Sequence, residues 1–264
     1  MHPELFHFHT PSFLHGFLPD EIAIYSYGAL ILMGVLMAFW YLKTNAYRDF
    51  GLSEENSQSL LLGLIIMSVV GGKFFMIFEN PNFYLSNPKE LISNSGFVFY
   101  GSLIFSMGFV FWFIKKHKLS AWKFLDLIGF VALIVHFFGR LGCFMAGCCH
   151  GIESHGPFAV VFTDPLSMAE PLNTPLHPTQ LYSSFMLASI FGILTFAKTR
   201  QKFEGQMFLL YLILYSTGRS IIEEFRGDEA RGFLLDGWYS NSQFISTLIV
   251  IAAIIAYALR MRKN

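Results

Sequence analysis

The feature that most constrains this chain is a series of long apolar segments, each long enough to cross a lipid bilayer. A transmembrane helix needs roughly 20 apolar residues, within a range of about 17–25. Seven segments qualify, at about 22–43, 58–78, 97–114, 122–147, 178–197, 206–226 and 238–259. Only 14% of the residues are charged, against about 25% in soluble domains. We therefore predict an all-α, polytopic integral membrane protein with seven transmembrane helices. Residues 1–264 are expected to form a single membrane domain, in which residues 1–21 are an N-terminal outer arm.

The positively charged residues orient these segments. Cytoplasmic loops of membrane proteins carry an excess of Lys and Arg, and here one set of alternate loops holds twelve of these residues while the other set holds three. The twelve are Lys43, Arg48, Lys115, Lys116, Lys118, Lys123, Lys198, Arg200, Lys202, Arg260, Arg262 and Lys263, and the three are Lys89, Arg226 and Arg231. We therefore predict an N-terminus outside and a cytoplasmic C-terminus. The formal net charge of zero offers no basic surface to a nucleic acid.

Three cations, Lys73, Arg140 and Arg219, lie inside predicted spans. A charge within the bilayer costs roughly 2.5–3.5 kcal/mol on insertion scales, so such residues generally mark a functional site. A structural ion pair, or a side chain that reaches the interface, would explain any single one of them. All three, however, lie within about two helical turns of the outer ends of their spans. We predict that they face a shared site at the level of the outer leaflet.

One helical face of the sixth span carries charged residues, because positions three, four and seven apart share a face. Arg219, Glu223 and Arg226 lie on this face, whereas Glu224 points elsewhere. Arg219 and Glu223 have the spacing of an ion pair within a helix. Such a pair either neutralises itself or forms part of a catalytic centre.

A second face, on the fourth span, carries His136, Arg140, Cys143 and Gly147, and reaches His150 if the helix continues. The glycines around it indicate close helix packing or a backbone that approaches a ligand. Arginine presents a planar fork that holds phosphate oxygens with two hydrogen bonds. At the outer leaflet the abundant phosphate belongs to membrane lipid, so the sequence predicts an enzyme that acts on a phospholipid head group.

Short polar motifs follow one another in a specific order along the chain. They are Tyr27-Gly28, Gly71-Gly72-Lys73, Gly139-Arg140-Leu141-Gly142 with Gly147 and Gly151, His177-Pro178-Thr179-Gln180-Leu181-Tyr182, Gly218-Arg219, Glu223, Phe225-Arg226, Gly237-Trp238 and Ser242-Gln243. In order and spacing the chain resembles the bacterial prolipoprotein diacylglyceryl transferases over nearly its whole length. These multi-pass enzymes of the cytoplasmic (inner) membrane transfer the diacylglyceryl group of phosphatidylglycerol to the cysteine thiol of a prolipoprotein signal peptide. They release glycerol phosphate and need no cofactor.

The resemblance also implies roles for individual residues. Arg140 would bind the phosphatidylglycerol head group, and Arg219 and Glu223 would belong to the catalytic centre. Tyr27 and Gly151 would line the site. The chemistry needs a thiolate as nucleophile and cations that hold the leaving phosphate.

Three positions depart from the family pattern. Tyr100 stands where the family has an essential His before Gly-Gly, and we place it among the substrate-binding residues. Cys143 and Cys148 stand where the family usually has Asn and Glu. His136 and His150 are candidates for the missing base, because an imidazole with a pKa near 6.5 can accept a thiol proton. The alternative for each is a hydrogen-bonded structural histidine.

The three cysteines lie within seven residues of one another. A Cys143–Cys148 disulfide would form if the helix breaks at Gly147. A metal site would need a further ligand, and the spacing differs from the paired C-x-x-C of zinc ribbons, so we predict no metal. In a third alternative Cys143, Cys148 or Cys149 accepts a lipid group, in a divergent lipid-modifying paralogue with another thiol acceptor.

Two other classes of protein share charged residues in their spans. A proton-coupled membrane transporter could use His136 as a relay, but transporters usually have polar groups at mid-membrane and repeated halves, which this sequence lacks. A retinal protein needs a lysine for its Schiff base, and the last span has none. The lipid-modifying transferase is the interpretation that the sequence favours.

Overall fold

The computed structural model describes residues 2–10, 21–93, 96, 98–226, 233–234 and 239–263, and these are predominantly helical. Seven helices have 18 residues or more: α1 (Ser26–Phe50), α2 (Glu54–Glu79), α5 (Phe99–His117), α6 (Ala121–Ala146), α7 (Thr179–Lys198), α8 (Gln206–Glu223) and α9 (Asn241–Met261). Two short helices, α3 (Pro81–Ser86) and α4 (Pro88–Ser93), follow α2. Each predicted span coincides with one long helix.

Five of the long helices, α1, α2, α6, α7 and α9, are long and apolar enough to cross a membrane. The multi-pass character is therefore confirmed. The crossing of α5 and α8, and the orientation of the chain, stay predictions.

Helix caps explain where two predicted boundaries were wrong. Ser53 accepts a hydrogen bond from the backbone N–H of Asn56, so α2 begins at Glu54, before its apolar run. Ser240 and Gln243 form a capping box that begins α9 at Asn241, three residues later than predicted. Polar caps of this kind satisfy the free N–H groups of a first turn, which a search for apolar runs does not register.

Strands are the feature that the all-α prediction missed. The described residues include three two-stranded antiparallel sheets: β1 (Glu4–His9) with β2 (Glu21–Tyr25), β3 (Val160–Val161) with β4 (Pro175–Leu176), and β5 (Phe233–Leu234) with β6 (Tyr239–Ser240). Four of the six strands lie outside the apolar segments on which the prediction was built, and β2 and β6 overlap the starts of the first and last of these segments. Only β1 and β2 have more than two residues.

The chain divides into two compact units, of which the second comprises residues 39–127. Within it α2 and α5 pack closely where Gly71 and Gly101 meet. A Cβ atom on either glycine would lie 2.2–2.3 Å from the carbonyl oxygen of the other. The buried Ser102 donates its hydroxyl to the carbonyl of Ser68 at 2.7 Å. Two of the predicted motifs, at Gly71 and at Tyr100-Gly101-Ser102, therefore hold two helices together.

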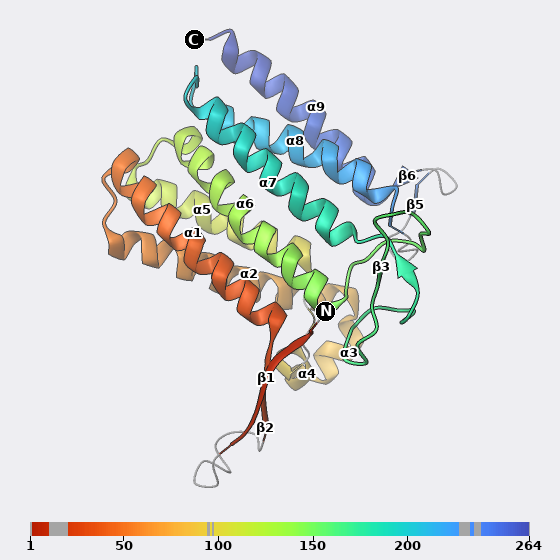
Figure 1. Ribbon diagram of the computed structural model, residues 1–264. Coiled ribbons are helices and arrows are strands. Elements are labelled where there is room, and N and C mark those ends of the chain that lie inside the picture. Colours follow the sequence, from red (N-terminus) through yellow and green to blue (C-terminus); the bar gives the residue numbers. More distant parts are fainter. Residues whose placement is uncertain are drawn as a thin grey trace. The chain divides into compact units, whose positions relative to one another are not determined.

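The first unit comprises residues 1–38 and 128–264. Within it α7, α8 and α9 lie side by side (Figure 1), and the ring of Phe130 on α6 packs against Phe191 on α7 at 5.5 Å. The chain between α6 and α7 forms a small core of its own, in which Phe144 and Leu172 pack against buried Phe162, Ala169 and Leu176. This segment lies at the end of the unit where α6 and α8 finish and α7 and α9 begin (Figure 1).

Candidate functional site

Arg140 and His136 form the centre of the candidate site, on the last three turns of α6. The Nε atom of Arg140 donates to Nε2 of His136 at 3.2 Å. On the neighbouring helix, the ring of Tyr215 lies 5.4 Å from that of His136. Arg219 is one turn further along α8, and both guanidinium groups interact electrostatically with His136. The two in-span arginines therefore face the same region.

Arg140 keeps most of its hydrogen-bonding capacity. The residue is half-buried, and within the part of the chain that the structure describes only its Nε is used, by His136. Among the described residues Arg140 has no carboxylate partner. A guanidinium whose terminal nitrogens are not paired with a carboxylate can still bind two oxygens of a phosphate.

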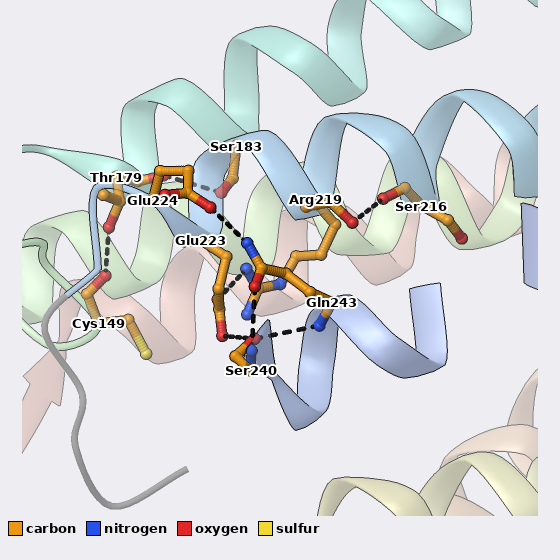
Figure 2. Close-up of polar contacts among 10 residues, drawn as sticks. Cys149, Thr179, Ser183, Ser216, Arg219, Glu223, Glu224, Ser240 and Gln243 are labelled. Atoms are coloured by element: carbon orange, nitrogen blue, oxygen red, sulfur yellow. Dashed lines mark hydrogen bonds and ion pairs between the residues drawn. The ribbon is translucent and has the colours of Figure 1, made fainter. Parts of the chain in front are cut away.

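Arg219 and Glu223 form the second part of the site, near the end of α8. They make an ion pair, and their side chains are 13% and 7% exposed. Ser240, the buried N-cap of α9, donates its hydroxyl to Oε1 of Glu223 at 3.2 Å. Figure 2 shows these three side chains converging from the two helices, while Gln243 reaches Glu224. The charged pair predicted from the sequence is thus present. Ser240, which the sequence analysis did not single out, holds the carboxylate of the pair with a hydrogen bond.

Gly151 lies where three segments meet. Its N–H donates to the carbonyl of His177 at 2.8 Å. An added Cβ would lie 2.1 Å from the carbonyl oxygen of Phe225 and 2.8 Å from side-chain atoms of His177 and Thr179. The neighbouring N–H of Ile152 donates to that same Phe225 carbonyl at 3.0 Å. The absence of a side chain at Gly151 therefore lets the loop after α6 join the start of α7 to the end of α8.

The loop after α6 also brings the three cysteines together. All three are free thiols of intermediate burial, and their sulfur atoms lie within 4.8 Å of one another. Hydrogen bonding with the thiols of Cys143 and Cys148, helped by the charges of Arg226 and Arg140, lowers the pKa of Cys149. Hydrogen bonding with Cys143 and Cys149 raises the pKa of Cys148. The helix ends at Ala146, so the break at Gly147 that a Cys143–Cys148 disulfide would need is present, but the described cysteines are not paired as a disulfide.

His150 does not lie on the helical face of Arg140, as it would if α6 continued. Gly147 adopts a φ of +81° and turns the chain away. Both ring nitrogens of His150 then face backbone groups: Nδ1 is 2.9 Å from the carbonyl oxygen of Gly151, and Nε2 accepts from the N–H of Glu170 at 3.4 Å. In His136, Nε2 accepts from Arg140. These contacts favour positioning roles for both histidines, and their predicted role as a base stays a prediction.

The two tyrosines predicted to bind the substrate, Tyr27 and Tyr100, belong to different units of the chain. Tyr27, 41% exposed, packs at the start of α1 against Gly142, whose Cβ would lie 2.9 Å from the tyrosine ring. Tyr100 and Lys73 belong to the second unit, so their predicted place in the site stays a prediction. The predicted Gly237-Trp238 motif and Arg231 lie outside the described residues.

Two contributions to the site were present in the sequence but received no role. Ser240 and Gln243 have the spacing of a capping box, a signal that could have identified Ser240 at the start of α9. Thr179 and Gln180 stood in a recognised motif. Their side chains donate to the carbonyl groups of Cys149 and Cys148, each at 2.7 Å. The polar start of α7 therefore holds the cysteine loop.

Comparison with known proteins agrees with the motifs. Residues 17–259 match the family model described as prolipoprotein diacylglyceryl transferase. A phosphatidylglycerol–prolipoprotein diacylglyceryl transferase of Clostridium tetani is 37% identical, over 92% of this chain and 96% of its own length. A phosphatidylglycerol–prolipoprotein diacylglyceryl transferase 2 of Clostridium perfringens is 31% identical, over 92% of this chain and 93% of its own length. A phosphatidylglycerol–prolipoprotein diacylglyceryl transferase of Enterococcus faecalis is 30% identical, over 91% of this chain and 88% of its own length. The chain belongs to the prolipoprotein diacylglyceryl transferase family.

Proposed function

We propose that this protein transfers the diacylglyceryl group of phosphatidylglycerol to the cysteine thiol of prolipoprotein signal peptides. The family and the names of three relatives at 30–37% identity support this activity. The structural observation that carries it is Arg140. Its half-buried guanidinium is oriented by His136, lies near Arg219, and has no carboxylate partner among the described residues.

In this reaction the acceptor sulfur forms a bond to the glyceryl carbon that carries the phosphate. The bond from that carbon to the phosphate oxygen breaks, and glycerol phosphate leaves with the electron pair. Arg140 binds the phosphate and stabilises its growing negative charge. Arg219 lies close enough to contribute to the same field, with Glu223 and Ser240 holding it in place.

The arginines also favour the thiolate form of the acceptor. Next to Lys or Arg, a cysteine pKa falls from about 8.5 to roughly 3.5–7.5. The positive field at Arg140 and Arg219 therefore reduces the need for a strong base, which is consistent with Tyr100 in place of the family histidine. Tyr27 and Gly151 line the site on the α1 side and at the loop, and Tyr100 contacts the substrate.

The setting of the site is part of the same proposal. Residues 1–264 form one membrane domain whose seven long helices cross the bacterial inner membrane, with the N-terminus outside. The ends of α6 and α8 then lie at the outer leaflet, within reach of lipid head groups and of signal peptides. Reporter fusions after residues 93 and 118 test this orientation, because the first reporter is expected outside and the second in the cytoplasm.

The activity is tested with purified protein, phosphatidylglycerol labelled in its diacylglyceryl part, and a lipobox peptide. We expect label on the peptide and an equal amount of released glycerol phosphate. A matched peptide with serine in place of the lipobox cysteine is expected to stay unlabelled. Folded protein that transfers no label, or that labels both peptides equally, would contradict the proposal.

A further inference from the structure

The cluster of Cys143, Cys148 and Cys149 has the geometry of a metal site that the transferase reaction does not use. The three sulfur atoms lie within 4.8 Å of one another. Around a single zinc ion with Zn–S bonds of about 2.3 Å, sulfur ligands are roughly 4 Å apart. Small side-chain adjustments would therefore place all three sulfurs on one ion. Their intermediate burial leaves the cluster accessible to an incoming ion.

The backbone holds these sulfurs in place before any ion arrives. Cys149 has a φ of +62°, a left-handed conformation that residues with a side chain adopt only rarely. This conformation lets two consecutive cysteines face the same point as Cys143 on α6. Thr179 and Gln180 fix the carbonyl groups of Cys149 and Cys148 at 2.7 Å. Figure 2 shows the Cys149 sulfur on the side of its backbone away from Thr179.

The charges near the cluster also suit a thiolate complex. Arg226 and Arg140 interact electrostatically with Cys149. Three thiolates around a divalent ion carry a net charge of −1, and around a monovalent ion −2. Two guanidinium groups therefore stabilise the loaded site, although they would repel a bare cation bound by neutral ligands.

We propose that Cys143, Cys148 and Cys149 bind one thiophilic metal ion, such as Zn²⁺ or Cu(I), through three thiolates. Soft sulfur ligands select these ions. The sequence had argued against a metal because it offers no fourth ligand in a standard spacing. A three-coordinate ion, or one completed by solvent, needs no fourth residue. The proposal is independent of the transfer reaction, because metal binding is measured without lipid or peptide substrate.

The first test is titration of the reduced, tag-free protein in detergent with Cd²⁺, whose thiolate complexes absorb in the ultraviolet. We expect one Cd²⁺ per chain with a thiolate charge-transfer band, and displacement by Zn²⁺. Cys148→Ser is expected to lose the band. The matched control is His9→Ala, which removes a ligand from the second cluster of suitable residues, His7, His9 and Glu21, and should keep it. Binding that survives Cys148→Ser, or that disappears with His9→Ala, would overturn the proposal.

A second measurement needs no variant. X-ray absorption of the Zn²⁺-loaded protein should show three sulfur ligands at about 2.3 Å. A shell of nitrogen and oxygen alone would place the metal elsewhere and refute the site. Fully reduced wild-type protein that binds neither Cd²⁺ nor Zn²⁺ would show that the cysteines serve only as thiols or as a disulfide.

Discussion

The Nε atom of Arg140 donates a hydrogen bond to Nε2 of His136, one turn earlier on α6, at 3.2 Å. This contact fixes the direction of the guanidinium and occupies the lone pair that a catalytic histidine would use. Arg219 also interacts electrostatically with His136, so two positive charges act on the imidazole. We infer that His136 is a positioning residue for Arg140.

The first prediction concerns this contact. A hydrogen bond to a charged group contributes about 1.5–3 kcal/mol, so His136→Ala should raise KM for phosphatidylglycerol by roughly 10–100-fold and lower kcat less. His136→Gln offers another acceptor and should recover part of the loss. Steady-state kinetics at several pH values checks this. If kcat falls instead, with loss of one limb of the pH profile, His136 acts as a base.

The second prediction concerns the ion pair of Arg219 and Glu223. Removing one partner of a buried pair costs ~3–5 kcal/mol, because the other charge stays buried. Glu223→Gln should therefore lower the thermal unfolding midpoint strongly, and Arg219→Gln in the same chain should restore part of it without restoring activity. The control is Glu54→Gln in the exposed pair with Lys43, worth ~0.5 kcal/mol. Equal destabilisation by Glu223→Gln and Glu54→Gln would contradict the buried pair.

The third prediction compares two helix caps. Ser53 and Ser240 each accept a hydrogen bond from their helix, at 3.2 and 3.1 Å, but only Ser240 also donates to Glu223. Replacing either serine by alanine should cost ~1 kcal/mol of stability. Only Ser240→Ala should also reduce transferase activity. Similar activity in the two variants, measured at equal amounts of folded protein, would remove Ser240 from the site.

The fourth prediction concerns Gly151. An added methyl group would meet the Phe225 carbonyl at 2.1 Å, and backbone cannot move aside as a flexible side chain can. Gly151→Ala should therefore destabilise the protein and abolish transfer. Gly192→Ala is the control, because no described heavy atom lies within 4 Å of its added methyl. Alanine also stabilises a helix by up to ~1 kcal/mol relative to glycine, so this variant should be at least as stable as the wild type. A stable, active Gly151→Ala variant would contradict the three-segment junction.

Much of the fold could be predicted from the sequence, because bilayer length and apolar runs locate helices. The seven predicted spans coincide with the seven long helices. The boundaries at Ser53 and Ser240 were missed because capping is a local polar effect. The three small sheets were missed because they form by backbone pairing between short segments, whereas the prediction searched for apolar runs of bilayer length.

The candidate site was predicted only in part. Positions four apart on one helix correctly paired Arg219 with Glu223 and joined His136 to Arg140. The same spacing would have brought His150 onto this face only if the helix had continued, and α6 ends before Gly147. Contacts between segments far apart in the chain, such as Ser240 with Glu223 or Gly151 with Phe225, depend on tertiary packing, and no spacing in the sequence encodes them.

The most direct test of the account is the transferase assay with Arg140→Lys and Arg140→Ala. The matched control is Arg200→Ala, because Arg200 is exposed and follows the C-terminal end of α7. The account predicts wild-type transfer for Arg200→Ala, severe loss for Arg140→Ala, and a smaller loss for Arg140→Lys, since an ammonium group keeps the charge but not the two-pronged geometry. Transfer from phosphatidylglycerol by folded Arg140→Ala at the wild-type rate would contradict the claim that Arg140 holds the phosphate.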